Sequence, residues 1–147
     1  MKRIMLIGKS GAGKTTLCQA IYEEQFVYQK TQTIQIIGTA IDTPGEYLEH
    51  RNYYNALMVT ASDADVIVLV QEIGDKYSMY APGFSGMFNK ETVGVITKID
   101  TICSKNFEEE ANAAEIILKS AGCEKIFRIS SIIGEGIVAF LEYLSDD

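Results

Sequence analysis

The sequence lacks the features of an exported or membrane-spanning protein. Its three cysteines, Cys18, Cys103 and Cys123, are odd in number and show no CxxC or metal-like spacing, which argues against a disulfide framework or a zinc site. The apolar run after the basic start is broken at Gly8, Lys9 and Ser10, so no signal-peptide core is formed. No apolar stretch approaches the ~18 residues needed to span a bilayer. We therefore expect a cytoplasmic protein with reduced thiols and no membrane span.

Basic residues are also scarce, since 13 Lys and Arg stand against 20 Asp and Glu, giving a net charge of -7. This balance opposes the long-range attraction that nucleic acids and anionic membranes exert, so neither partner is expected. A polyphosphate site in such a chain has to create its own positive potential. Backbone N–H groups, a helix N-terminus, one or two lysines and a bound cation can supply it.

The order of apolar segments predicts an α/β fold in one domain over residues 1–147. Short runs rich in Val and Ile alternate with helical patterns, as in a mostly parallel sheet covered by helices. A short antiparallel edge is expected from Ile34–Ile37 and Thr39–Ile41, which flank Gly38. The other predicted strands are Arg3–Ile7, Ala64–Gln71, Glu91–Thr97 and Lys125–Ser130, and the predicted helices are Lys14–Glu24, Tyr47–Ala61, Asn106–Ser120 and Gly136–Leu144. The irregular segment Gly74–Asn89 is expected to form a loop followed by a short helix.

One motif matches the phosphate-binding pattern GxxxxGK[ST] without exception and lies between a predicted strand and a predicted helix. Its glycines let the backbone wrap around phosphate oxygens, and its N–H groups and the helix N-terminus add positive potential. Lys14 would bridge the terminal phosphates, and Thr15 would give Mg²⁺ a hydroxyl ligand. The predicted phosphate contacts are Gly8, Lys9, Ser10, Gly11, Ala12, Gly13, Lys14, Thr15 and the following Thr16.

A second motif, Asp42-Thr43-Pro44-Gly45, follows a predicted strand and fits the pattern DxxG. The Asp42 carboxylate is expected in the Mg²⁺ shell. Gly45 would offer its N–H to the terminal phosphate, because a missing Cβ permits close approach and a later change of conformation. Taken alone, the same residues would also make a good β-turn.

The third motif, Thr97-Lys98-Ile99-Asp100, has the form [NT]KxD and ends an apolar strand. A carboxylate in the crevice beyond a strand's carboxyl end can accept two hydrogen bonds from the N1–H and exocyclic amine of guanine. Asp100 is therefore the predicted base-reading residue, with Thr97 and Lys98 beside it. Ser130 and Ser131 end the last predicted strand and precede Gly134-Glu135-Gly136. This order resembles the SAxxGxG element of many GTPases, and the resemblance implies that the two serines support the base.

The order of these motifs resembles the Era-like small GTPases over nearly the whole chain. The combination of KSGAGKTTL, YxKTQT, DTPGEYLE, the segment Pro82–Phe84 and TKID is more closely similar to the EutP/PduV family. The resemblance implies a three-layer P-loop NTPase fold of the small GTPase type. It also implies a role in ethanolamine or propanediol utilisation, a pathway protein as partner and association with a bacterial microcompartment. Ser131 stands where alanine is usual, and Gly11 stands where Era-like proteins that use a monovalent cation often have asparagine.

Two positions determine what kind of GTPase the resemblance implies. Such proteins present a switch-loop threonine to Mg²⁺ and the terminal phosphate; Thr31 is preferred here, and Thr33 is the alternative. Glu46 stands where many relatives carry the glutamine that orients the attacking water. A carboxylate cannot donate a hydrogen bond as an amide can, so we expect slow unassisted hydrolysis. If Glu46 has no catalytic role, it is expected as a favourable anion in the first turn of a helix. If Thr31 has none, it is expected as a β-branched residue of an edge strand.

Three functions follow as hypotheses. The first is a Mg²⁺-dependent protein that binds GTP and GDP, hydrolyses GTP slowly through Lys14, Thr31, Gly45 and Glu46, and holds the metal with Thr15, Thr31 and Asp42. The second is an ATP-dependent acetate kinase of the same pathway, since phosphoryl transfer depends mostly on positioning and charge neutralisation. The third is a nucleotide-dependent module that binds a partner. The base read at Asp100 separates the first from the second.

Overall fold

A computed structural model describes residues 2–30 and 40–145, the side chains of residues 24–30 excepted. Within these residues the fold has five strands in the order β2-β1-β3-β4-β5, and every neighbouring pair is parallel. The strands are β1 (Ile4–Ile7), β2 (Ile41–Asp42), β3 (Val66–Glu72), β4 (Glu91–Thr97) and β5 (Lys125–Arg128). The predicted α/β class with a mostly parallel sheet is therefore confirmed. Ile34–Ile37 of the predicted antiparallel edge lies outside the described residues.

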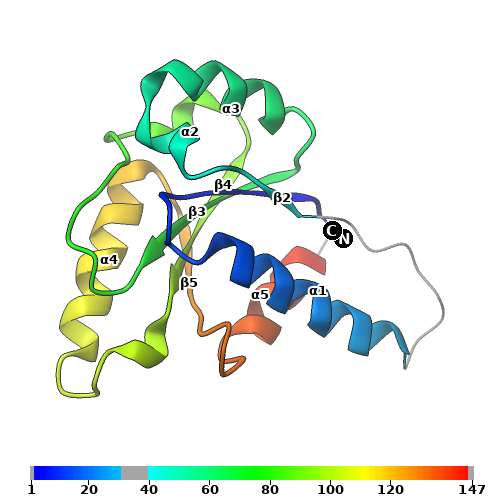
Figure 1. Ribbon diagram of the computed structural model, residues 1–147, viewed down its shortest axis with the longest axis vertical. Helices are drawn as coiled ribbons and strands as arrows, with labels where there is room; N and C mark the ends of the chain where they lie inside the picture. The colour runs from blue at the N-terminus through cyan, green and yellow to red at the C-terminus, as the bar shows by residue number, and fades with distance from the viewer. Residues whose placement is uncertain (1, 31–39, 146–147) are drawn as a thin grey trace.

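Helices cover both faces of the sheet (Figure 1). One core joins the sheet to α1 (Lys14–Lys30) and α5 (Ile137–Ser145) through the buried residues Leu17, Ile21, Phe140 and Leu144. The other core lies under α2 (Glu46–Glu49), α3 (Tyr54–Ala61) and α4 (Phe107–Ala121). Because successive strand residues point to opposite faces, Met5 and Ile7 enter one core while Ile4 and Leu6 enter the other. A sheet buried on both faces explains the near-continuous apolar runs.

The predicted helix Tyr47–Ala61 is wrong as a single element. The chain forms α2, an extended residue at His50 (φ -129°, ψ 122°), the 3-10 turn η1 (Arg51–Tyr53) and then α3. The Tyr47 and Tyr53 rings stack across this break with centroids 5.0 Å apart. Aromatic stacking therefore stabilises a bend that helical spacing alone does not show.

The irregular segment packs its aromatic residues into the core. Tyr80, Phe84 and Phe88 are buried, and Tyr54 of α3 meets the Phe84 ring edge-on at 5.7 Å. Phe84 begins the 3-10 helix η2 (Phe84–Met87), which is the expected short helix. The segment thus substitutes for a longer helical layer on this side of the sheet.

Cys18, Cys103 and Cys123 are free thiols. Burial is the main cause that raises the pKa of both the Cys18 and the Cys123 thiol to about 12, so both stay protonated at neutral pH.

Across residues 2–30 and 40–145, no helix has the length and hydrophobicity required to cross a membrane.

The strand order places a ligand crevice at one end of the sheet. β1 has β2 on one side and β3 on the other, and open α/β sheets bind ligands beyond the carboxyl ends of strands where the order reverses. The loop after β1 is the GxxxxGK[ST] motif, and the ends of β2, β4 and β5 carry the other predicted site residues. The fold therefore brings all the described motifs to the same edge.

Candidate nucleotide-binding site

The loop from Gly8 to Gly13 connects β1 to α1, which begins at Lys14. Gly11 and Gly13 have positive φ, 82° and 98°, a region that residues with a Cβ rarely adopt. The Ala12 N–H donates to the Lys9 carbonyl at 3.1 Å and closes the turn. The sequence thus folds into a tight loop whose end is a helix N-terminus, an arrangement suited to anions.

Lys14 lies at the bottom of this loop with 6% of its surface exposed. Its Nζ donates to the Lys9 carbonyl at 3.0 Å, across the loop. Burial lowers the pKa of Lys14, while the carboxylates of Asp42 and Glu49 oppose that shift. An anion bound in the loop would oppose the effect of burial and favour the charged ammonium.

Thr15 and Asp42 come together from α1 and β2. The Thr15 hydroxyl donates to Asp42 Oδ2 at 2.6 Å, and the parallel pairing of Leu6 with Asp42 sets the height of the carboxylate beside the loop. The next residue fixes the chain, because the buried Thr43 hydroxyl donates to the Leu6 carbonyl at 2.6 Å. Neighbouring ligands of an octahedral Mg²⁺ lie about 3 Å apart, given metal–oxygen distances of about 2.1 Å. These two oxygens therefore fit adjacent positions on such an ion.

Gly45 presses against the loop backbone. A Cβ added to Gly45 would lie 2.3 Å from the Ser10 nitrogen and 2.6 Å from Ser10 Cα. The loop backbone thus leaves no room for a side chain at this position, while the contact of the Gly45 N–H with a terminal phosphate stays a prediction. Glu46 follows as the exposed first residue of α2.

The third motif braces the loop from the other side. The buried Thr97 hydroxyl donates to the Ala12 carbonyl at 2.6 Å, and Lys98 Nζ donates to the Gly11 carbonyl at 2.8 Å. Lys98 also pairs with Glu72 at the end of β3. Its own backbone is left-handed, with φ 61°, which is uncommon for a residue with a side chain. Hydrogen bonds therefore join two motifs whose residues lie 85 positions apart in the sequence.

Asp100 is exposed beyond the end of β4 and is oriented by the last loop. Ser130, fully buried, donates its hydroxyl to Asp100 Oδ1 at 2.7 Å and accepts the Ile133 N–H at 3.2 Å. One carboxylate oxygen is thus fixed by a hydrogen bond, and the group lies at the surface where a base could reach it. Ser131, the residue after Ser130, is half-buried.

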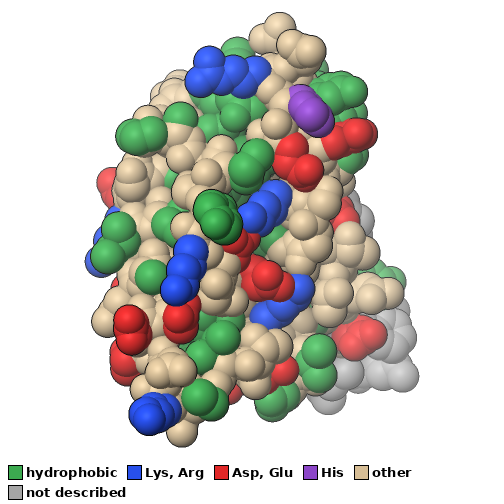
Figure 2. All heavy atoms as spheres, turned by 60° about the vertical axis from the view of Figure 1, so that its left-hand side comes forward, with side chains coloured by type: hydrophobic (Ala, Val, Ile, Leu, Met, Phe, Trp, Pro, Cys, Tyr) green, Lys and Arg blue, Asp and Glu red, His purple; other side chains and the backbone are tan. Residues whose placement is uncertain are grey.

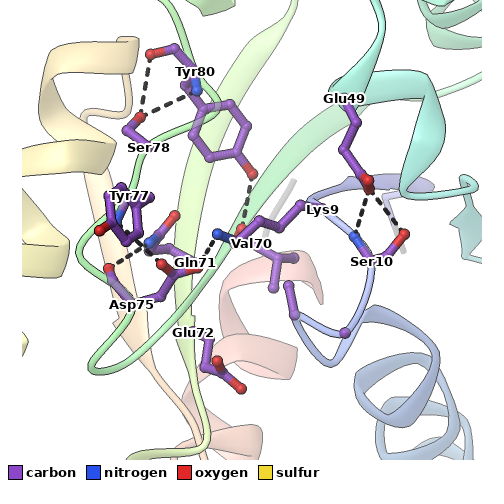
Figure 3. Close-up of polar contacts among 12 residues, drawn as sticks. Lys9, Ser10, Glu49, Val70, Gln71, Glu72, Asp75, Tyr77, Ser78 and Tyr80 are labelled. Carbon is purple, nitrogen blue, oxygen red and sulfur yellow. Dashed lines mark hydrogen bonds and ion pairs between the residues drawn. The ribbon is translucent and has the colours of Figure 1, made fainter.

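Several residues around the loop were not anticipated from the sequence. Figure 3 shows Lys9 and Ser10 pointing in opposite directions, Lys9 toward its ion-pair partner Asp75 and Ser10 toward Glu49. The Tyr80 hydroxyl lies within hydrogen-bonding distance of the Ile7 carbonyl at 2.9 Å and the Val70 carbonyl at 2.8 Å. No sequence motif marks these partners, because each contact joins segments that are distant in the chain.

The basic side chains near the site are mostly neutralised by neighbours. On the face shown in Figure 2, lysines and arginines stand among acidic side chains, and both Lys9 and Lys98 form ion pairs. The positive potential for a phosphate chain therefore has to come from the loop N–H groups, Lys14 and the N-terminus of α1.

A comparison with protein-family models matches residues 1–146 to the family PduV-EutP, described as "Ethanolamine utilisation - propanediol utilisation". The chain belongs to this family. The predicted family resemblance is confirmed over almost the whole sequence.

Relatives of this PduV-EutP protein include the "Propanediol utilization protein PduV" of Citrobacter freundii, which is 41% identical over 99% of this chain and 94% of that protein. The "Probable acetate kinase EutP" of Escherichia coli K12 is 31% identical over 99% of this chain and 90% of that protein.

Among solved structures, the PduV-EutP chain is similar to translation elongation factor SelB of Methanococcus maripaludis. The apo form has a TM-score of 0.68 at 21% identity over 97% of this chain, and the complex with the GTP analogue GppNHp has a TM-score of 0.65 at 19% identity over the same share. This chain spans about a third of SelB, 32% of its length. The likeness establishes the P-loop GTPase fold that was predicted.

Thr31, like its alternative Thr33, lies outside the described residues. Thr16 is exposed on the first turn of α1.

Proposed function

We propose that this protein binds GTP with Mg²⁺, hydrolyses it slowly and acts as a switch in ethanolamine or propanediol utilisation. The observation that carries the proposal is the Ser130–Asp100 bond of 2.7 Å, in a motif whose Thr97 and Lys98 are bonded to the phosphate loop. A guanine held by Asp100 would thus have its phosphates placed over the loop. The family description supports the pathway.

The geometry of the loop and of the Thr15–Asp42 pair supports the proposed phosphate and metal roles. Loop N–H groups and Lys14 would hold the phosphate chain, and Thr15 and Asp42 would each give an oxygen to Mg²⁺. The described residues contain no cluster of three or more His, Cys, Asp or Glu side chains that could hold a metal by themselves. Mg²⁺ commonly uses few protein ligands and completes its shell with phosphate oxygens and water. When bound, it would neutralise charge on the phosphates. Thr31 is proposed as a further ligand.

Slow hydrolysis is proposed because of Glu46. It follows Gly45 at the start of α2 and is exposed, so it can reach the space next to a terminal phosphate. A carboxylate there accepts a proton from water but gives the transferring phosphoryl group no hydrogen bond and repels it. Turnover of about one per second or more without a partner, a rate typical of kinases, would contradict this proposal.

The base preference is tested by measuring the dissociation constants of Mg-GTP and Mg-ATP by calorimetry. We expect wild type to prefer GTP and Asp100→Ala to lose at least about tenfold in GTP affinity, because a charge-assisted bidentate contact contributes more than 1.4 kcal/mol. Asp63→Ala is the control, since Asp63 is an exposed carboxylate in the turn before β3. Equal or tighter binding of ATP in wild type would overturn the proposed base recognition.

A second candidate function is ATP-dependent phosphorylation of acetate. The name of the relatives that are 31% identical, "Probable acetate kinase EutP", favours it. The loop, Lys14 and the Mg²⁺ oxygens would serve that reaction equally well, because its catalysis is mainly positioning and charge neutralisation. The test is acetyl phosphate formation from ATP and acetate, with Lys14→Ala as the inactive control.

We further propose that the protein works in the cytoplasm with a protein of the pathway or of a bacterial microcompartment as partner. A nucleotide-dependent interaction is the third hypothesis, in which turnover is incidental. Acceleration of GTP hydrolysis by an added pathway protein would support it, and identical rates with and without such proteins would argue against it.

A further inference from the structure

Glu49, the last residue of α2, accepts hydrogen bonds from the phosphate loop. Glu49 Oε2 accepts the Ser10 backbone N–H at 3.0 Å and the Ser10 hydroxyl at 2.9 Å (Figure 3). Ser10 is the third residue of the GxxxxGK[ST] loop, whose N–H groups are suited to phosphate oxygens. The protein's own carboxylate thus already satisfies two donors that an incoming anion would use.

The position of this contact identifies which phosphate would compete with it. Gly45, proposed to contact the terminal phosphate, approaches Ser10 so closely that an added Cβ would lie 2.3 Å from the Ser10 nitrogen. Ser10 therefore borders the space in which the terminal phosphate would lie. Glu49 also acts electrostatically on Lys14 at the bottom of the loop. The carboxylate and a terminal phosphate would thus compete for the same donors and the same ammonium.

The carboxylate would repel that phosphate. Hydrogen bonds from Ser10 keep the pKa of Glu49 below its usual range, with the backbone N–H as the larger cause and the hydroxyl as the next. Glu49 is therefore charged at neutral pH. Two anions a few ångströms apart repel each other. A nucleoside diphosphate has no phosphate at this position and leaves the carboxylate undisturbed.

We propose that Glu49 is a specificity-determining residue that holds the terminal-phosphate position of the loop in the free and diphosphate-bound protein and must be displaced by a nucleoside triphosphate. Glu49 thereby lowers the preference for triphosphate over diphosphate. Because Glu49 ends α2 immediately before the extended residue His50, its displacement frees this end of the helix from the loop. The inference rests on the proposed nucleotide site but not on the identity of the base.

The experiment measures dissociation constants for GDP, ADP and the nonhydrolysable analogues GppNHp and AppNHp, with Mg²⁺, on wild type, Glu49→Gln and Glu49→Ala. The result is the ratio of diphosphate to triphosphate dissociation constants for the base that binds better. Glutamine keeps the shape and an acceptor oxygen but removes the charge. We expect both variants to raise this ratio at least about tenfold, chiefly through tighter triphosphate binding, with diphosphate affinity within about twofold of wild type. The control Glu109→Gln removes an exposed carboxylate on the first turn of α4 and should leave the ratio unchanged.

The two proposals fail in different ways. If wild type and both variants bind nucleotides but share the same ratio, Glu49 does not determine specificity and the nucleotide site stands. If Glu109→Gln raises the ratio as much as Glu49→Gln, the effect is one of overall charge and the inference is overturned. If wild type binds none of the four nucleotides, the proposed function itself is wrong, and the role of Glu49 falls with it.

Discussion

At the scale of single residues, Gly45 shows how closely two motifs approach. Its backbone is right-handed helical (φ -58°, ψ -31°), so alanine would adopt it without strain, yet a Cβ would overlap the Ser10 backbone at 2.3 Å. We expect Gly45→Ala to lower the free energy of unfolding by about 1–3 kcal/mol, which is the usual cost of overpacking. Urea denaturation measures this change. Gly86→Ala is the matched control, because a Cβ there meets nothing within 4 Å. Equal effects of the two substitutions would contradict the close approach.

At the scale of elements, the segment between β3 and β4 is tied to the base of the phosphate loop by Tyr80. Its buried hydroxyl lies at 2.9 Å from the Ile7 carbonyl and 2.8 Å from the Val70 carbonyl. Tyr80→Phe should lower the free energy of unfolding by about 1–3 kcal/mol, because a buried acceptor loses its donor. Tyr77→Phe, at a tyrosine 79% exposed in the same segment, should stay within about 0.5 kcal/mol of wild type. Thermal denaturation of the pair measures the difference, and similar losses would argue against the anchor.

At the scale of the whole molecule, nucleotide binding should stabilise the fold, because the site joins the ends of β1, β2, β4 and β5. A ligand at 100 times its Kd adds about 2.7 kcal/mol, which corresponds to roughly 5–11 °C in Tm for a chain of about this size. We expect Mg-GTP to give such a shift in differential scanning calorimetry, and excess EDTA or Thr15→Ala to reduce it. A shift that is unchanged in EDTA would contradict the proposed role of Mg²⁺.

Much of the fold was predictable because its signals are local. The strand Glu91–Thr97 was predicted with its observed bounds, and the helix predicted over Asn106–Ser120 is observed as α4 (Phe107–Ala121). Hydrophobic periodicity and turn residues act within one element. The break at His50 could not be predicted in this way, because no glycine or proline marks it in the sequence. It accompanies the stacking of Tyr47 on Tyr53, which is a contact across the break.

The sequence by itself determined the motifs, their order and hence the family and the sheet edge that carries them. Thr15 and Asp42 were both predicted from their motifs to contact one Mg²⁺, and their oxygens lie 2.6 Å apart. Only the tertiary structure decided the contacts between segments without a shared motif. Glu49 meets Ser10 across 39 residues and Tyr80 meets Ile7 across 73, because packing of the helical layer on the sheet, rather than any local pattern, sets which side chains reach the loop.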